Sequence, residues 1–206
     1  MSVTLILVIA TSIATIYAWN NPHIQAKWIF NPYTVRRNNE YHRFLTSGFI
    51  HGSWLHLIFN MFVLYMFGEQ IEMVFKSIFG DLGLALYIIM YLAAIIVSEI
   101  PTYLKNIDNP GYNSLGASGG TAAILFSYIL FDPMQSLCLY GLLCFPGVMW
   151  GALYIIYSIY MGKRQMDNVN HDAHLWGGLF GVGFTILVYP GVVISFFQQL
   201  TNLSIF

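Results

Sequence analysis

Two polar side chains stand at the starts of apolar stretches in positions that suit nucleophilic catalysis. Ser118 lies in the run Gly116-Ala117-Ser118-Gly119, and His174 begins another apolar stretch. A serine hydroxyl becomes an effective nucleophile when a base such as neutral histidine accepts its proton. A serine at a helix start also lies beside unpaired backbone N–H groups, which can stabilise an oxyanion. Ser118 and His174 are therefore a candidate nucleophile and general base.

A second pair of residues could hold the oxygen that becomes negatively charged. His56 and Asn60 lie near the start of a third apolar stretch, four residues apart, so they share one face of a helix. Both side chains donate hydrogen bonds, and with the backbone N–H of Ser118 they would complete an oxyanion hole. Taken alone, the pair also fits a polar contact between two helices.

Glycines accompany both candidate catalytic residues. Gly116 and Gly119 flank Ser118, and Gly177 and Gly181 follow His174 at the small-xxx-small spacing of closely packed membrane helices. These four residues predict that the helices of Ser118 and His174 approach each other closely.

Neighbouring residues favour a two-residue site without a metal or cofactor. Asp172 is two positions from His174 and points to a different helix face, which favours a Ser–His dyad over a triad. His171 and His174 lack the cysteine or carboxylate cluster that would complete a metal site. Cys138 and Cys144 are six residues apart in an apolar stretch, and we expect small hydrophobic side chains there rather than a disulfide.

The composition predicts a membrane protein that lies within a lipid bilayer. Of the 206 residues, 57% are hydrophobic and 8% are charged, whereas about a quarter are charged in soluble domains. The net charge of −1 offers no basic surface for nucleic acid. The length fits one domain over residues 1–206.

The predicted architecture is all-α, with six transmembrane helices joined by polar connections. A span needs about 17–25 mainly apolar residues. Six segments qualify, at about 2–18, 49–67, 81–100, 115–131, 137–160 and 173–189. The connection 20–48 mixes aromatic and basic residues and is expected at the membrane interface. His42 and His51 lie near this interface and are expected in structural or loop-facing roles.

Six spans impose a common depth on the candidate site. Every even-numbered span enters the membrane from the same side. His56 lies in the first half of span two, Ser118 opens span four and His174 opens span six. The three side chains are therefore expected near one face of the membrane.

Together these motifs resemble the rhomboid family of intramembrane serine proteases. The matching features are Gly116-Ala117-Ser118-Gly119, His56-x-x-x-Asn60 and Ala173-His174-x-x-Gly177-x-x-x-Gly181, with Arg43 and Glu72 also at positions typical of the family. The resemblance implies a six-helix fold, a structured interfacial segment after span one and a water-filled cavity that opens to the extracytoplasmic side.

The sequence departs from the family pattern in three ways. His42-Arg43 replaces a common Trp-Arg pair, and Ala122 stands where an aromatic residue often stacks on the catalytic histidine. The connections after spans one, three and five carry seven of the eight Lys and Arg residues, and the positive-inside rule would put them in the cytoplasm. That charge distribution opposes the orientation that the resemblance implies.

The resemblance implies hydrolysis of peptide bonds in or beside transmembrane segments of membrane-protein substrates. Ser118 would act as nucleophile and His174 as base, while Phe145, Pro146, Gly147 and Trp150 mark a candidate lateral gate in span five. We expect a bacterial inner membrane, with the site facing outward. The alternative is a catalytically silent protein of the same fold that binds or escorts membrane proteins. A small transporter is disfavoured because the polar residues cluster in one half of the membrane.

Overall fold

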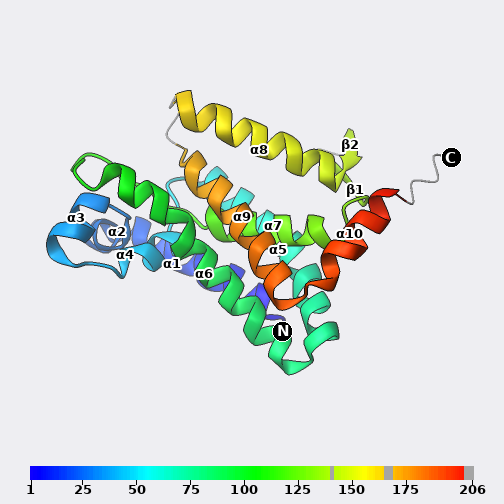
Figure 1. The fold of residues 1–206 in the computed structure, drawn as a ribbon. Helices are drawn as coiled ribbons and strands as arrows, with labels where there is room; N and C mark the ends of the chain where they lie inside the picture. The colour runs from blue at the N-terminus through cyan, green and yellow to red at the C-terminus, as the bar shows by residue number, and fades with distance from the viewer. Residues whose placement is uncertain (140–141, 165–168, 202–206) are drawn as a thin grey trace.

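The chain forms a helical bundle with one short β-hairpin. The computed structural model describes residues 1–139, 142–164 and 169–201 (Figure 1). The helices are α1 (Val3–Trp19), α2 (Pro22–Trp28), α3 (Pro32–Asn38), α4 (Arg43–Thr46), the 3-10 turn η1 (Ser47–Phe49), α5 (Trp54–Phe79), α6 (Asp81–Asn106), α7 (Ser118–Phe131), α8 (Gly147–Arg164), α9 (His171–Val188) and α10 (Gly191–Thr201). The hairpin pairs β1 (Ser136–Leu139) with β2 (Leu143–Pro146).

Polar caps define where three of the long helices begin. The side-chain oxygens of Ser2, Ser53 and Asn170 each accept a hydrogen bond from the backbone N–H three residues further on, at 3.1–3.2 Å. Such a cap satisfies one of the N–H groups that a first turn leaves unpaired, and it contributes about 1 kcal/mol. The caps fix the starts of α1, α5 and α9.

α7 lies at the centre of the bundle, packed against α5, α6 and α9. α7 and α9 run parallel at a constant sequence offset of 58. Their contacts pair Gly119 with Gly177, Ala123 with Gly181, and Ser127 with Thr185, whose hydroxyls are 2.7 Å apart. A constant offset along two helices keeps the same ends together, so the starts of α7 and α9 lie at one end of the bundle.

The helices α2–α4 form a separate cluster beside α1, at one side of the bundle in Figure 1. The Arg43 side chain is buried and ties this cluster together. It donates hydrogen bonds to the carbonyls of Ala26 and Ile29, at 2.7 and 2.8 Å, and to the Glu40 carboxylate at 2.6 Å. The expected structured segment after span one is therefore present.

Two expected connections are helical. The prediction that the second span ends near residue 67 is wrong, because α5 continues to Phe79 and only Gly80, at φ +62°, separates it from α6. Glu72 is part of this extension. Its carboxylate accepts from the backbone N–H groups of Val3 and Thr4 at 2.9 and 2.7 Å, and it thereby binds α5 to the first turn of α1. α6 likewise continues past Pro101 to Asn106.

The expected fifth span is wrong in its first part. Residues 136–139 and 143–146 form the two strands of the hairpin, and α8 begins only at Gly147. Cys138 and Cys144 are cross-strand partners joined by a disulfide, which corrects the expectation of two separate hydrophobic side chains. The proposed gate is divided accordingly, since Phe145 and Pro146 lie in β2. A short apolar run without a clear period fits a strand as well as a helix.

Fewer helices meet the length and hydropathy of a membrane span than the sequence predicted. α5 and α6 qualify, and α9 with α10 would make a third if this pair, bent by 111°, is one broken span. α1 and α7 are apolar but shorter, at 17 and 14 residues. Helices occupy all six expected regions, but a bundle of six full spans is not confirmed within the described residues.

Candidate active site

Ser118 is the first residue of the central helix. The residue before it, Ala117, caps α7, and Gly116 turns the chain into the helix at φ +123°, a conformation that favours glycine. The first backbone N–H groups of α7 have no partner within the helix, because none is available four residues earlier. The Ser118 hydroxyl therefore lies beside N–H donors and the positive end of the helix dipole.

The segment that precedes Ser118, residues 114–117, is held by the region between α2 and α5. Ser114 and Phe30 exchange two backbone hydrogen bonds, each 3.0 Å. Gly116 donates its N–H to the carbonyl of Ser47 at 2.9 Å, and Ala117 donates to the His51 Nε2 atom at 3.3 Å. We call residues 114–117 the nucleophile loop. Its anchors explain how the structured segment after α1 determines where α7 starts.

His51 is one of these anchors, and its hydrogen bonds define which ring nitrogen carries the proton. The Thr15 hydroxyl donates to the carbonyl of Phe49 at 3.1 Å, so it accepts from His51 Nδ1 at 3.0 Å. Nε2 is then free to accept from Ala117. Burial lowers the pKa of His51 to about 3, with a smaller effect from His56, so the ring stays neutral near pH 7.

His174 lies in the first turn of α9, beside the start of α7. A Cβ atom added to Gly177 would lie 2.3 Å from the Gly119 carbonyl oxygen and 2.8 Å from its Cα atom. A Cβ atom on Gly181 would lie 2.2 Å from the Ala123 carbonyl oxygen. The two backbones touch at these levels, and this contact brings the ends that carry Ser118 and His174 together.

Tyr154 of α8 stacks on the imidazole of His174. Their ring centroids are 6.0 Å apart with an interplanar angle of 28°, within the range of offset-stacked aromatic pairs. The Tyr154 ring also contacts the ring of Phe126 in α7, with 5.5 Å between their centroids. Tyr154 thus occupies the role expected for an aromatic residue at position 122, where this chain has Ala122. No local motif could indicate this, since Tyr154 and His174 are on different helices.

His56 and Asn60 both contact the start of α7. A Cβ atom on Gly116 would lie 2.7 Å from His56 Nε2, so the His56 ring lies directly against the nucleophile loop. Asn60 accepts a hydrogen bond from the Thr121 hydroxyl at 3.1 Å and donates one to the carbonyl of His56 at 2.9 Å. One N–H of the Asn60 amide is thereby engaged within α5, and the second is the one available for an oxyanion.

The other titratable residues near His174 have separate partners. Asp172 forms an ion pair with Lys105 at 3.3 Å. His171 is buried and its ring contacts those of Tyr157 and His174, at 5.4 and 5.7 Å between centroids. Across the described ranges, no group of three His, Cys, Asp or Glu residues is placed to hold a metal ion.

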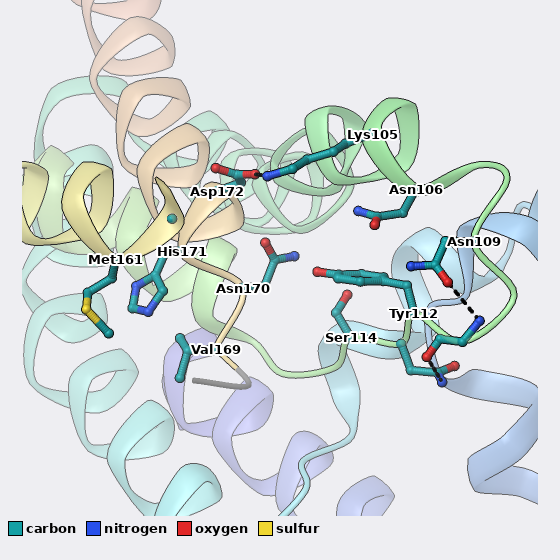
Figure 2. A pocket seen from close by; sticks show the side chains of 13 residues that line it. Lys105, Asn106, Asn109, Tyr112, Ser114, Met161, Val169, Asn170, His171 and Asp172 are labelled. Carbon is teal, nitrogen blue, oxygen red and sulfur yellow. Dashed lines mark hydrogen bonds and ion pairs between the residues drawn. The ribbon is translucent and has the colours of Figure 1, made fainter. Parts of the chain in front are cut away.

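A polar cavity of about 440 Å³ opens next to the site (Figure 2). Its walls come from the end of α6, the segment 109–114, the end of α8 and the start of α9. Figure 2 shows the side chains of Tyr112, Ser114 and Asn170 directed toward one another, with the Lys105–Asp172 pair at the edge. The cavity therefore adjoins both the nucleophile loop and the first turn of α9.

Ser118 and His174 lie at the same end of two adjoining helices, Ser118 as the first residue of α7 and His174 in the first turn of α9.

Comparisons with known proteins match the sequence of this chain to a family. The Rhomboid domain model matches residues 38–191. The mouse presenilin-associated rhomboid-like protein, mitochondrial, is 31% identical over 146 residues, which cover 68% of this chain and 36% of that protein. The chloroplastic rhomboid-like protein 11 of Arabidopsis thaliana is 29% identical over 167 residues, with 77% and 56% covered.

The chain therefore spans between about a third and somewhat over half of the length of these relatives. Their names place them in mitochondria and chloroplasts, so they do not support the expected bacterial inner membrane. The family match covers all of α5–α9, which carry the candidate site. The chain belongs to the rhomboid family of membrane proteins.

Proposed function

We propose that the chain is an intramembrane serine endopeptidase that hydrolyses peptide bonds in or beside the transmembrane segments of other membrane proteins. The observation that carries this proposal is the parallel contact of α7 and α9, with Gly177 against the backbone of Gly119. Because each catalytic residue lies within one turn of this contact, the approach of the two backbones supports a Ser118–His174 dyad.

The proposed reaction has two steps. The Ser118 oxygen attacks the scissile carbonyl while His174 takes the hydroxyl proton and then gives it to the leaving amine. Water next attacks the acyl-enzyme, with His174 as base, and releases the carboxylic acid and free Ser118. The N–H groups of the first turn of α7, with His56 and Asn60, hold the oxyanion in both steps. No metal or organic cofactor takes part in these steps.

Tyr154 orients the imidazole of His174 in the proposed mechanism. Its ring stacks on the His174 imidazole and would hold the plane of that ring during proton transfer from Ser118. The polar cavity beside the nucleophile loop offers a route for the water that the second step consumes. A substrate segment must be extended to expose its carbonyl groups, which favours substrates whose helices unwind easily.

Two arguments about the compartment that the site faces oppose each other. The family resemblance implies an extracytoplasmic opening. The disulfide lies at the opposite end of α7 from Ser118, and disulfides persist in oxidising compartments. The Lys and Arg residues are concentrated at the end of the bundle that carries Ser118. The disulfide and these cations are the argument for a site that opens toward the cytoplasm or an equivalent reducing compartment. The labelling experiment in the Discussion distinguishes the two.

The direct test is covalent labelling of the nucleophile. A fluorophosphonate probe is incubated with the purified protein in detergent, and the modified peptide is identified by mass spectrometry. We expect modification at Ser118, reduced strongly in the His174→Ala variant. Folded protein that fails to react, or a modification at another serine, would refute the dyad.

The alternative function, that of a catalytically silent relative which binds or escorts membrane proteins, predicts a different result in the same assay. A silent relative would bind a transmembrane peptide as tightly as its Ser118→Ala variant does, without cleaving it and without reacting with the probe.

A further inference from the structure

Glu99 is a buried carboxylate between the two segments that carry the candidate catalytic residues. It lies on α6 and is 6% exposed. Burial of a carboxylate is costly unless its oxygens accept hydrogen bonds, so its partners identify the contacts that the fold maintains. We propose that Glu99 is a positioning residue, which fixes the nucleophile loop relative to the first turn of α9.

The two carboxylate oxygens contact different segments. Oε1 accepts a hydrogen bond from the Ser114 hydroxyl at 3.0 Å, in the nucleophile loop. Oε2 accepts from the side-chain amide of Asn170 at 3.0 Å. Ser114 is four residues before Ser118, and Asn170 is four residues before His174. One side chain therefore reaches both segments at the same distance along the chain from each catalytic residue.

Each partner is itself fixed by a second contact. Ser114 exchanges two backbone hydrogen bonds with Phe30. The Asn170 side-chain oxygen caps α9 through the Ala173 N–H at 3.1 Å, and it accepts from the Thr102 hydroxyl at 3.0 Å. The Asn170 oxygen thus accepts two hydrogen bonds, while its amide nitrogen donates to Glu99. A shift of Glu99 would be transmitted to the start of α9.

Both partners of Glu99 lie beside the polar cavity. Ser114 and Asn170 line it, and Figure 2 shows their polar ends directed toward the same space. Water that enters the cavity would compete for the hydrogen bonds of both residues. A carboxylate that accepts from both residues keeps the gap between the nucleophile loop and α9 constant while water has access. This role concerns the same site as the proposed function and rests on it for its catalytic consequence.

The chain provides a matched control in Glu72, a second buried glutamate of the described residues. Glu72 is 8% exposed and accepts from the backbone N–H groups of Val3 and Thr4 at the start of α1. Both residues are buried carboxylates that hold the beginning of a helix. Only Glu99 contacts the segments that carry Ser118 and His174.

The first measurement is amide hydrogen exchange, which does not depend on activity. We expect Glu99→Leu to raise exchange together in residues 114–118 and 170–174, by about tenfold or more. Glu72→Leu should raise exchange at residues 3–6 and leave the other two segments unchanged. Unchanged exchange in both site segments of a folded Glu99→Leu protein would overturn the proposal.

The second measurement separates kcat from KM for cleavage of a reconstituted transmembrane substrate. A misplacement of about 1 Å can reduce turnover by about 10²-fold, so we expect Glu99→Leu to lower kcat by at least about tenfold with little change in KM. Glu99→Gln should restore most of kcat, because glutamine can accept from Asn170 and donate to Ser114. Equal loss in the leucine and glutamine variants would refute a role through hydrogen bonding.

Two further variants apply if Glu99→Leu does not fold. Asn170→Ser keeps a residue that caps helices well but removes the donor to Glu99. Ser114→Ala removes the other donor and leaves the backbone bridge to Phe30. Each should lower kcat and raise exchange in its own segment, and normal values for both would overturn the proposal. Failure of wild-type protein to cleave would refute the proposed function alone, since the exchange measurement would still test the bridge.

Discussion

The contact between Gly177 and Gly119 predicts that Gly177→Ala lowers both the stability and the reactivity of the protein. The added methyl carbon would lie 2.3 Å from a carbonyl oxygen, whereas close carbon–oxygen contacts are normally about 3.3 Å or more. The obstacle is backbone on the central helix, so no side-chain rotation relieves it. α7 and α9 must separate by about 1 Å at the level just below the dyad.

The separation should reduce both stability and catalysis. Overpacking of this kind costs about 1–3 kcal/mol, and a displacement of about 1 Å between nucleophile and base lowers the rate by about 10²-fold. Thermal unfolding in detergent gives the first quantity, and the rate of fluorophosphonate labelling gives the second. We therefore expect slow labelling in protein that remains folded below its lowered melting temperature.

Gly183→Ala is the matched control on the same helix. A Cβ atom at Gly183 meets no other atom within 4 Å, and alanine favours a helix by about 1 kcal/mol relative to glycine. Its labelling rate should equal that of wild type, with equal or higher stability. Labelling of Gly177→Ala at the wild-type rate, with unchanged stability, would refute the conclusion that this backbone contact positions the dyad.

Three other predictions follow from the site. Tyr154→Phe should cleave at close to the wild-type rate, because the aromatic ring alone supplies the stacking. Tyr154→Leu should cleave about 2- to 10-fold more slowly, because a stacked pair contributes about 0.5–1.5 kcal/mol. The folded protein keeps His51 neutral, with its pKa at about 3, while the unfolded chain protonates this residue below about pH 6.5. Acid should therefore lower the free energy of unfolding, by about 2–3 kcal/mol at pH 4.5. For orientation, single cysteines replace Asn109 and Ser77 in a variant without the hairpin cysteines, and a membrane-impermeant thiol reagent is applied to intact cells or organelles. The orientation that the family implies predicts labelling at position 109 and none at position 77.

Each of these has a contradicting outcome. Equal rates for the two Tyr154 variants would remove stacking from the mechanism. A His51→Gln variant with the same loss of stability between pH 6.5 and 4.5 would show that other groups cause the acid effect. Labelling at position 109 alone would support the orientation implied by the family, and labelling at position 77 alone would support the orientation favoured by charge and by the disulfide.

The sequence predicted the parts of the fold that depend on local patterns. The glycine spacing after His174 indicated a close helix contact, and the structure has Gly177 against Gly119. The apolar stretches located the main helices, because apolar composition over about 20 residues is a local property. The six full spans did not follow, because several of these helices are short or interrupted.

The remaining features depend on contacts between distant segments. Tyr154 stacks on His174 across two helices, and Glu99 joins residues 15 and 71 positions away. No spacing rule identifies such partners. The hairpin was misread because its residues are as apolar as a span, and the pairing of Cys138 with Cys144 becomes visible only when the strands are in register.

The central claim is that Ser118 cleaves peptide bonds within the membrane, and reconstituted proteolysis tests it most directly. Purified wild-type protein and Ser118→Ala are each placed in liposomes with a labelled single-span substrate whose helix contains glycine. Mass spectrometry then identifies the products. The dyad predicts that wild type releases two fragments cut in or beside the span and that Ser118→Ala releases none while binding the substrate equally well. Equal cleavage by both proteins, or none by a folded wild-type protein across a panel of such substrates, would contradict it.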